Sequence, residues 1–495
     1  MIVQLDTSNL EDYRKFLKIK RFPKYKIVGR TAVFPDEYSH LLNLTPDQLG
    51  HAGEYDPLPG LWDYQEGISR IIIGKEKFAL FAECGMGKTM IYFEYVRHVL
   101  RYLNPGEAIL IVAPLMVVKQ IMSEARRFYG DSLPMVQVAS GNLDRWLAMG
   151  TEPIGVTNYE AMRPEVRQGR LRCLVLDESS MLKSFYGKWG TECIRLGQGL
   201  RWKLAGTGTP APNDRVEFAN HAVFLDQFPN VNSFLAKYFV NKGQTDNRWE
   251  MKAHAVGPFY RELSHWSIFL TDPSTYGWKD NCGGLPPINI KIHDIGLTQE
   301  QSDLAYRKQG WMFPVQAGGI TSRSRLSQIA KGNNNGVAVA TLKDQYIVDL
   351  VNSEPDRSTI IWCEYNPEQE KMAKLFPDAA NIAGNTPLAR RETLIEDFQR
   401  GRRKVLISKA KILGLGLNLQ ISDRHIFSGI QDSYEKYWQC IKRSNRPGSV
   451  NALDVHIPVT PIERPMLETV LKKANRVRED TAEQEREFRK NLIGV

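Results

Sequence analysis

The sequence predicts an α/β fold built from two tandem parallel sheets, each flanked by helices and joined by a helical connector. Two series of short apolar runs, at 61–222 and 341–458, alternate with segments whose apolar residues recur at helical spacing. Strands of a parallel sheet are buried on both faces, so they are expected to be continuously apolar, as these runs are. In addition, a glycine-rich turn directly follows the first run, as in phosphate-binding strand–turn–helix units.

The expected strands follow from these runs. In the first series they are residues 78–81, 108–113, 135–139, 154–157, 171–176 and 202–206. In the second series they are residues 359–363, 381–383, 405–408, 425–428 and 454–458.

Changes in composition divide the chain into five parts. A basic N-terminal segment (1–55) precedes the first α/β domain (56–222), and the second α/β domain (341–460) precedes a charged C-terminal helix (461–495). The region between the domains, 223–340, contains aromatic helical segments, a Pro/Gly-rich piece and the polar run KGNNNG. We therefore expect it to be a helical connector with a flexible loop.

The turn after the first strand predicts a phosphate site. In the sequence FALFAECGMGKTM (78–90), Gly85, Met86 and Gly87 form a turn that brings backbone N–H groups and a helix N-terminus toward a ligand. Lys88 is placed to reach the terminal phosphates, and the Thr89 hydroxyl to hold Mg²⁺. Mg²⁺ is therefore an expected cofactor of this phosphate site.

Two acids follow the apolar run at 171–176. Asp177 suits a metal ligand shared with the phosphate loop, and Glu178 suits the base that activates water. The hydroxyls of Thr207 and Thr209 follow the last strand of the series and are placed to sense the phosphate site.

A third group of polar residues lies in the second domain, in GLGLNL (414–419) and QCIKRSNRPG (439–448). Gln439, Arg443 and Arg446 are spaced i, i+4 and i+7, which predicts one face of a helix ending before Pro447. Arginines on one face can clamp a phosphoryl group in the transition state. The alternative is an ordinary basic helix face.

Charge and composition limit the classes of function. The net charge is +9, and the basic residues are unevenly distributed along the chain. Residues 13–30 combine many basic side chains with aromatic ones. Such a segment suits a nucleic-acid backbone or forms a solvated surface. No apolar stretch is long enough to cross a membrane, and the N-terminus lacks the apolar core of a signal peptide. The six cysteines lack disulfide or zinc spacing, which fits a reducing cytoplasm.

In this order, the motifs resemble those of superfamily 2 helicases and translocases, and specifically of the Swi/Snf-like branch. The resemblance extends over about residues 60–460 and includes LWDYQ (61–65), AECGMGKT (82–89), DESS (177–180), TGTPAPND (207–214), LTQEQ (297–301) and the two motifs of the second domain. The compact build is similar to that of viral or bacterial stand-alone members. Ser180, where many relatives carry His, departs from the pattern, as do Ala82 and Cys84 at the lip of the phosphate loop.

The resemblance implies two tandem RecA-like domains with ATP bound between them. Lys88, Thr89 and Asp177 would hold the phosphates and Mg²⁺, and Glu178 would activate water. Arg443 and Arg446 would act as fingers, with Arg446 on the γ-phosphate. The remaining nucleotide-binding positions would be Gln65, at the purine, together with Gly416 and Gln439.

The implied function is that of an ATP-dependent DNA translocase or helicase, acting on single- or double-stranded DNA as a monomer in the cytoplasm of a bacterium or a phage-infected cell. One alternative is an RNA helicase of the same superfamily. Another is a nucleic-acid-binding module that clamps on ATP without turnover, and a third is the motor subunit of a larger complex.

Overall fold

The structure is a computed structural model that forms two units. It describes residues 2–6, 8–22, 25–34, 42, 55–184, 187–243, 249–279, 285–306, 320–413, 418–430, 433–446 and 448–492. Unit 1 comprises Met1–Asn281 and Val477–Val495, and unit 2 comprises Cys282–Arg476. The boundary falls inside the expected connector, whose two parts belong to different units.

Unit 1 is built around a seven-stranded parallel sheet with the strand order β12-β4-β9-β8-β5-β7-β6. All six strands expected from the first series are present: β4 (Lys77–Ala82), β5 (Ala108–Ala113), β6 (Met135–Gln137), β7 (Ile154–Asn158), β8 (Leu171–Asp177) and β9 (Trp202–Gly206). The seventh, β12 (Ser267–Leu270), comes from the region expected to be connector. Its side chains are buried, and Phe269 packs edge-on against Phe81 of β4.

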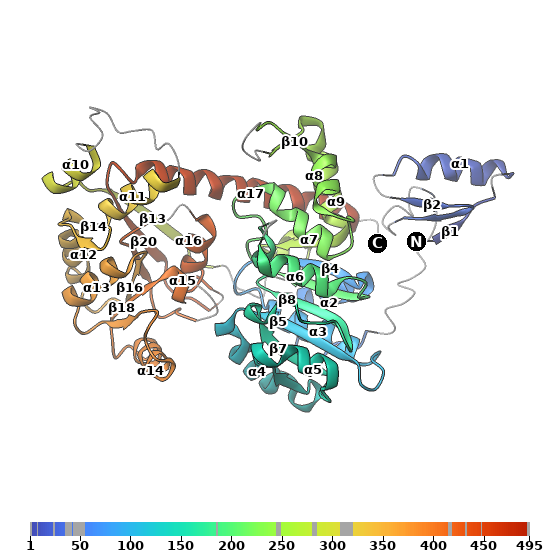
Figure 1. The fold of residues 1–495 in the computed structure, drawn as a ribbon, viewed down its shortest axis with the longest axis horizontal. Coiled ribbons are helices and arrows are strands. Elements are labelled where there is room, and N and C mark those ends of the chain that lie inside the picture. Colours follow the sequence, from blue (N-terminus) through green and yellow to red (C-terminus); the bar gives the residue numbers. More distant parts are fainter. Residues whose placement is uncertain are drawn as a thin grey trace. The chain divides into compact units, whose positions relative to one another are not determined.

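Helices cover both faces of this sheet (Figure 1). The helices between the N-terminal module and β12 are α2 (Asp63–Lys75), α3 (Lys88–Leu100), α4 (Leu115–Tyr129), α5 (Leu143–Met149), α6 (Lys188–Gly197), α7 (Phe218–Phe224), α8 (Val231–Tyr238) and α9 (Val256–Trp266). A short hairpin pairs β10 (Phe239–Asn241) with β11 (Trp249–Met251).

The charged C-terminal segment forms the long helix α17 (Arg464–Leu492). From Val477 onward it belongs to unit 1, where Asp480 accepts hydrogen bonds from Arg215 (2.6 Å) and from the Tyr260 hydroxyl (2.7 Å). Because Asp480 is nearly buried, these bonds compensate its charge and fix the helix against α9.

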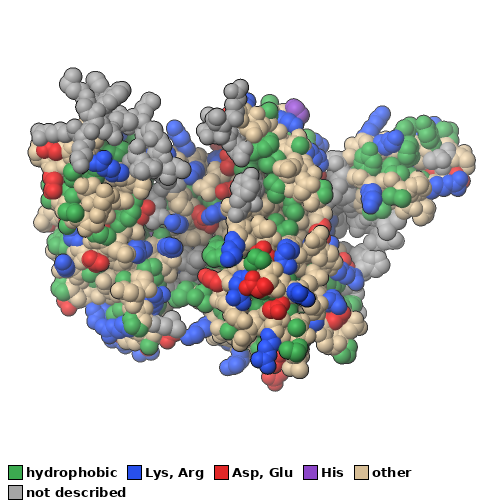
Figure 2. Space-filling model, in the orientation of Figure 1, with side chains coloured by type: hydrophobic (Ala, Val, Ile, Leu, Met, Phe, Trp, Pro, Cys, Tyr) green, Lys and Arg blue, Asp and Glu red, His purple; other side chains and the backbone are tan. Residues whose placement is uncertain are grey.

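The N-terminal segment folds into a small module with its own core. It comprises β1 (Ile2–Gln4), α1 (Leu10–Ile19), β2 (Lys26–Val28) and β3 (Thr31–Val33), which form an antiparallel sheet in the order β1-β3-β2. The core holds Leu5, Ile19, Phe22, Ala32, Phe34 and Leu42. Lys and Arg side chains lie beside hydrophobic ones on the surface of this module (Figure 2).

Unit 2 is built around a six-stranded parallel sheet with the strand order β13-β20-β19-β16-β18-β17. The five strands expected from the second series are present: β16 (Thr359–Cys363), β17 (Ala380–Ile382), β18 (Val405–Lys409), β19 (Arg424–Phe427) and β20 (Leu453–Val459). The sixth, β13 (Ile288–Asp294), again comes from the expected connector. The α/β fold with two tandem parallel sheets is therefore confirmed.

The helices of unit 2 are α10 (Gln299–Tyr306), α11 (Ile320–Ala330), α12 (Leu342–Asn352), α13 (Asn366–Leu375), α14 (Leu388–Gln399), α15 (Ala410–Leu413) and α16 (Tyr434–Ile441). The polar run KGNNNG, expected to be a flexible loop, forms a hairpin of β14 (Asn333–Asn334) and β15 (Val337–Ala338). Its first residue, Lys331, is buried, pairs with Glu364 and donates to the carbonyl of Ile430 (2.8 Å). These contacts explain why this polar segment is ordered.

Candidate functional site

The phosphate loop has the strand–turn–helix geometry expected from its sequence. Strand β4 ends at Ala82 and helix α3 begins at Lys88, with Gly85 at φ 92° and Gly87 at φ 61°. Both angles are in the region that favours glycine. A Cβ on Gly87 would lie 2.2 Å from the Gln65 side-chain nitrogen, so a side chain at this position would displace the Gln65 amide.

The side chains of Lys88 and Thr89 are placed at the start of α3. The Lys88 ammonium donates to the carbonyl oxygens of Ala82 (2.8 Å) and Glu83 (3.2 Å), so it lies over its own loop. Among the described residues, the Thr89 hydroxyl has no hydrogen-bond partner. A cation and a hydroxyl at a helix N-terminus form a suitable environment for an anion and its counterion.

Asp177 is the last residue of β8, at the carboxyl end of the sheet. Burial raises the pKa of its carboxyl to about 6; the negative charge of Glu178 raises it further, and the Lys88 ammonium opposes the shift. The ionised carboxylate is thus only partly compensated by the protein. The Asp177 carboxylate and the Thr89 hydroxyl are hard oxygen ligands, which fit Mg²⁺ completed by waters and phosphate oxygens.

Glu178 is held in a defined orientation by two hydroxyls. Its backbone is in the left-handed region (φ 55°, ψ 51°), which is unusual for a residue other than glycine and costs about 1–3 kcal/mol. Ser180 Oγ (2.9 Å) and Thr207 Oγ1 (2.7 Å) both donate to Glu178 Oε1. These bonds fix the orientation of the Glu178 carboxylate, which directly follows Asp177 in the sequence.

The contacts of Ser180 and Thr207 sharpen two sequence expectations. Thr207 was expected to sense the phosphate site, and its hydroxyl bonds directly to Glu178 while accepting from the Thr209 backbone N–H (3.1 Å). Ser180 occupies the position where many relatives carry His, and it makes the second contact to Glu178. The substitution therefore retains a polar link to the acid.

A buried histidine, which sequence reasoning missed, supports the turn after Glu178. The hydroxyl of Ser179 lies 3.0 Å from His221 Nε2, on helix α7. Burial lowers the pKa of His221 to about 4, so its ring is neutral at pH 7. The sequence offers no local signal for this pair, because it joins residues 42 positions apart.

Gln65 lies next to the phosphate loop, on the first turn of α2. Its Oε1 accepts from the Trp62 backbone N–H (3.0 Å), which makes it part of the helix cap, and its amide nitrogen faces Gly87. The neighbouring Tyr64 donates to the Met86 carbonyl (3.1 Å). The structure thus places Gln65 beside the loop, and a purine-binding role stays a prediction.

In unit 2, the expected helix is shorter than predicted. Helix α16 includes Gln439 but ends at Ile441, so the prediction that Arg443 and Arg446 continue its face is wrong. Both arginines lie in the turn that follows. The reason is tertiary: the Arg443 carbonyl accepts from Leu419 N–H (3.0 Å), and Ser444 Oγ donates to the Leu419 carbonyl (2.8 Å).

The two arginines have different surroundings. Arg443 is 3% exposed, and within the part of the chain that the structure describes its Nε has no hydrogen-bond partner. Arg446 is partly exposed, and its Nε donates to the Lys442 carbonyl (2.7 Å). Gly416, predicted to bind nucleotide, lies in 414–417, outside the described residues.

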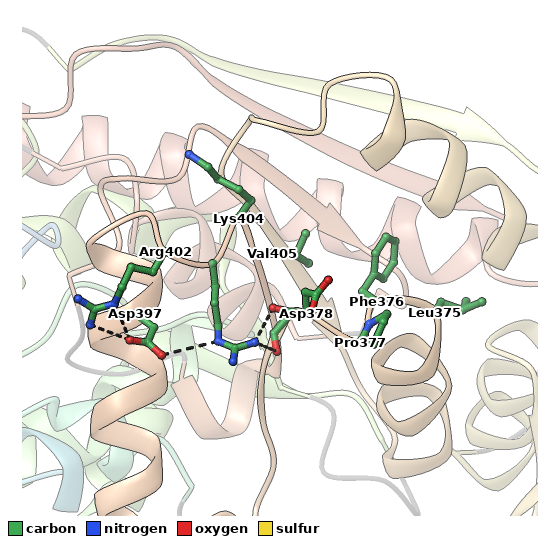
Figure 3. A pocket seen from close by; sticks show the side chains of 10 residues that line it. Leu375, Phe376, Pro377, Asp378, Asp397, Arg402, Lys404 and Val405 are labelled. Carbon is green, nitrogen blue, oxygen red and sulfur yellow. Dashed lines mark hydrogen bonds and ion pairs between the residues drawn. The ribbon is translucent and has the colours of Figure 1, made fainter.

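A pocket of about 600 Å³ in unit 2 is separate from these residues. It lies where β17 and β18 begin, whereas nucleotide sites of parallel sheets lie where strands end. Asp397 pairs there with Arg402 at 2.7 Å (Figure 3). Arg403 pairs with the same acid and donates to the Asp378 carbonyl (2.6 Å). Because these cations already have partners, the pocket is a poor candidate for phosphate binding.

Two family models match the chain. The SNF2-related domain matches residues 75–264, which include the phosphate loop and the acids, and the Helicase conserved C-terminal domain matches residues 342–448, which include the arginines. The chain is a Swi/Snf-like helicase of superfamily 2. These two domains indicate that the Swi/Snf-like chain is a nucleic-acid-dependent ATPase.

Solved structures similar to this chain include two with bound nucleic acid. The Sulfolobus solfataricus SWI2/SNF2 ATPase core in complex with dsDNA is 18% identical, with a TM-score of 0.41, and the match covers 82% of this chain and 89% of that one. S. cerevisiae Dbp5 bound to RNA and ADP BeF3 is 15% identical, with a TM-score of 0.47, and the match covers 82% and 86%. No curated protein matches the sequence. Among the described helices, none is long and apolar enough to cross a membrane.

Proposed function

We propose that this protein is a motor that hydrolyses ATP to move along DNA. The observation that carries the proposal is the arrangement around Glu178, which two hydroxyls orient beside Asp177 and within the same sheet edge as the phosphate loop. A module that only binds ATP has no need of an oriented base. The alternative of a clamp without turnover is therefore less well supported.

Each candidate site residue of unit 1 has a role in the proposed reaction. Lys88, which lies on the loop carbonyls, would pair with the terminal phosphates, and Thr89 and Asp177 would hold Mg²⁺. When bound, the metal neutralises charge that develops on the phosphate oxygens. Glu178 accepts a hydrogen bond from the attacking water and takes its proton, while Ser180 and Thr207 keep the carboxylate in place.

In this proposal, unit 2 supplies arginine side chains that stabilise the negative charge of the transferred phosphate. Arg446 is assigned to the γ-phosphate and Arg443 to a supporting position, as the family resemblance implies. Arg443 has no ion pair among the described residues although it is buried, so its charge is available to an anion. We propose that Gln65, Gly416 and Gln439 also bind the nucleotide.

We also include the N-terminal module among the nucleic-acid contacts. Its own core explains its fold, so the basic residues on its surface are not needed to brace it. Arg14 on α1 and Arg21 in the turn after this helix are both exposed, and no ion pair involves either within the described part of the chain. Tyr13 and Leu17, also on α1, are exposed as well. Cations beside an aromatic ring fit a phosphate backbone and its bases.

A steady-state ATPase assay tests the proposed function. Rates are compared without nucleic acid and with single-stranded DNA, duplex DNA and RNA, with Glu178→Gln as the inactive control. We expect strong stimulation by DNA and near-abolition in the variant. Equal rates with and without nucleic acid would rule out a motor, and stimulation by RNA alone would favour the RNA helicase.

A further inference from the structure

Helix α3 carries a buried tyrosine that the proposed mechanism does not use. Tyr92 lies one helical turn after Lys88 and therefore on the same face. It is 1% exposed, and its hydroxyl makes no hydrogen bond of good geometry with the residues that the structure describes. Buried tyrosine hydroxyls usually have a partner, so this one requires an explanation.

The strand register locates this hydroxyl. Asp177 of β8 lies directly beside Gly206 of β9. A Cβ on Gly206 would lie 1.7 Å from the Tyr92 hydroxyl oxygen and 2.5 Å from the ring carbon that bears it. The hydroxyl therefore fills the space above Gly206, which places it next to the Asp177 carboxyl.

The charges around Tyr92 keep its hydroxyl a donor. Burial raises its pKa well above the ordinary value, and the carboxylates of Asp177 and Glu178 raise it further. The hydroxyl in turn lowers the pKa of Asp177. A protonated phenol beside a carboxylate can donate one hydrogen bond to it as soon as the carboxylate turns toward it.

We propose that Tyr92 is a positioning residue that holds the Asp177 carboxylate in the orientation needed to bind Mg²⁺, and that Gly206 is required to admit its hydroxyl. The proposal rests on the proposed function, since it assumes that Asp177 is the metal ligand. Groups that hydrogen-bond to a metal-binding carboxylate fix its orientation. No proton is transferred: Tyr92 donates a hydrogen bond and Asp177 remains the acceptor.

A Mg²⁺ titration of nucleotide binding tests this role directly. The full-length chain binds a fluorescent ATP analogue, and the apparent Mg²⁺ affinity is measured for wild type and Tyr92→Phe. We expect the variant to bind Mg²⁺ about tenfold more weakly, as is typical when a metal ligand loses its supporting hydrogen bond. Nucleotide binding without Mg²⁺ should be unchanged, because the phosphate loop is intact.

Tyr95→Phe is the matched control. Tyr95 lies on the same helix and is equally buried, but its hydroxyl donates to the carbonyl of Glu76. A defect in Tyr92→Phe that is absent from Tyr95→Phe supports the proposal. An unchanged Mg²⁺ titration in Tyr92→Phe, or an equal defect in both variants, overturns it. If Mg²⁺ does not change nucleotide binding by the wild type at all, the proposed function itself fails instead.

Gly206→Ala tests the same contact from the other side. Its methyl group should displace the Tyr92 hydroxyl and weaken Mg²⁺ binding as Tyr92→Phe does. Because this variant is crowded, Gly206→Ala combined with Tyr92→Ala provides a less strained comparison. We expect the double variant to keep the Mg²⁺ defect, because it also lacks the hydroxyl. Normal Mg²⁺ affinity in the double variant would contradict the role assigned to the hydroxyl.

Discussion

The two units hold their candidate functional side chains in different ways. In unit 1 these groups bond to one another and to their own loops: Ser180 and Thr207 donate to Glu178, and Lys88 donates to Ala82. In unit 2 the turn that carries Arg443 is fixed through its backbone, by Leu419, and the Arg443 guanidinium has no ion pair among the described residues. Unit 1 is therefore preorganised internally, whereas unit 2 holds a buried cation that has no ion pair within its described residues.

This difference suggests a division of tasks. Groups that are oriented before ligand arrives reduce the reorganisation needed at the moment of reaction. A buried cation without an acidic neighbour gains most when it meets an anion from elsewhere. Changes in unit 1 should therefore alter metal binding or water activation, and changes at the arginines should alter turnover while leaving nucleotide binding intact.

The largest effect is expected for Arg446→Ala. A finger acts mainly in the transition state, and its loss typically lowers kcat by about a thousandfold or more. We expect DNA-stimulated ATP turnover to fall by that order while the affinity for a fluorescent ATP analogue changes little. Arg400→Ala serves as the control, because Arg400 is exposed and pairs with Glu396 on α14. Normal turnover in Arg446→Ala would show that the finger is misassigned.

Glu178→Gln should have the next largest effect. The amide keeps the shape of the side chain and its bonds to Ser180 and Thr207 but is too weak a base to take a proton. A positioned base contributes about 10²–10⁴-fold, so we expect kcat to fall within that range at unchanged nucleotide affinity. The rate of ATP hydrolysis in a single-turnover experiment measures this effect. A variant that keeps more than a tenth of wild-type activity would exclude Glu178 as the base.

Removing one of the two hydroxyls should have a smaller effect. A hydrogen bond to a charged group contributes about 1.5–3 kcal/mol, so Thr207→Val is expected to lower kcat by about tenfold or somewhat more. Ser180→Ala should cost less, since the fully buried Thr207 still donates to Glu178. The double variant should lose more than the two single effects combined, because the acid then has neither donor. Strict additivity in this cycle would argue that the two hydroxyls act independently.

Local patterns predicted most of the fold, because buried parallel strands are continuously apolar. Strand β13 was missed because polar residues interrupt it, and β12 because SIFL continues an aromatic helical segment. The site was predictable as far as it depends on consecutive residues, as at Gly85–Thr89. Long-range contacts could not be predicted from the sequence. In the sequence, Tyr92 looks like part of an apolar helix face, and only the register of β8 with β9 shows that it lies near Asp177. Likewise, α16 ends early because Leu419 bonds to the turn after it.

The smallest effect is expected at the N-terminal module, whose cations lie far in sequence from the catalytic motifs. We propose the double variant Arg14→Glu and Arg21→Glu, which reverses two exposed charges without touching the core around Ile19 and Phe22. Each lost phosphate contact lowers the salt dependence of duplex binding by about 0.9 in the slope of log K against log salt concentration. We therefore expect weaker DNA binding at low salt and a slope smaller by about 2.

The control for this variant is chosen to separate a contact from a general charge effect. Arg400→Glu and Arg486→Glu also remove two exposed positive charges, but Arg400 pairs with Glu396 and Arg486 with Glu483. ATP turnover without nucleic acid should be normal in both double variants, since neither lies in the phosphate loop or beside Glu178. If the N-terminal double variant and the control double variant reduce the salt dependence of DNA binding equally, the N-terminal module contributes only its net charge. A reduction confined to the Arg14 and Arg21 variant would instead identify the N-terminal module as a second point of attachment to DNA.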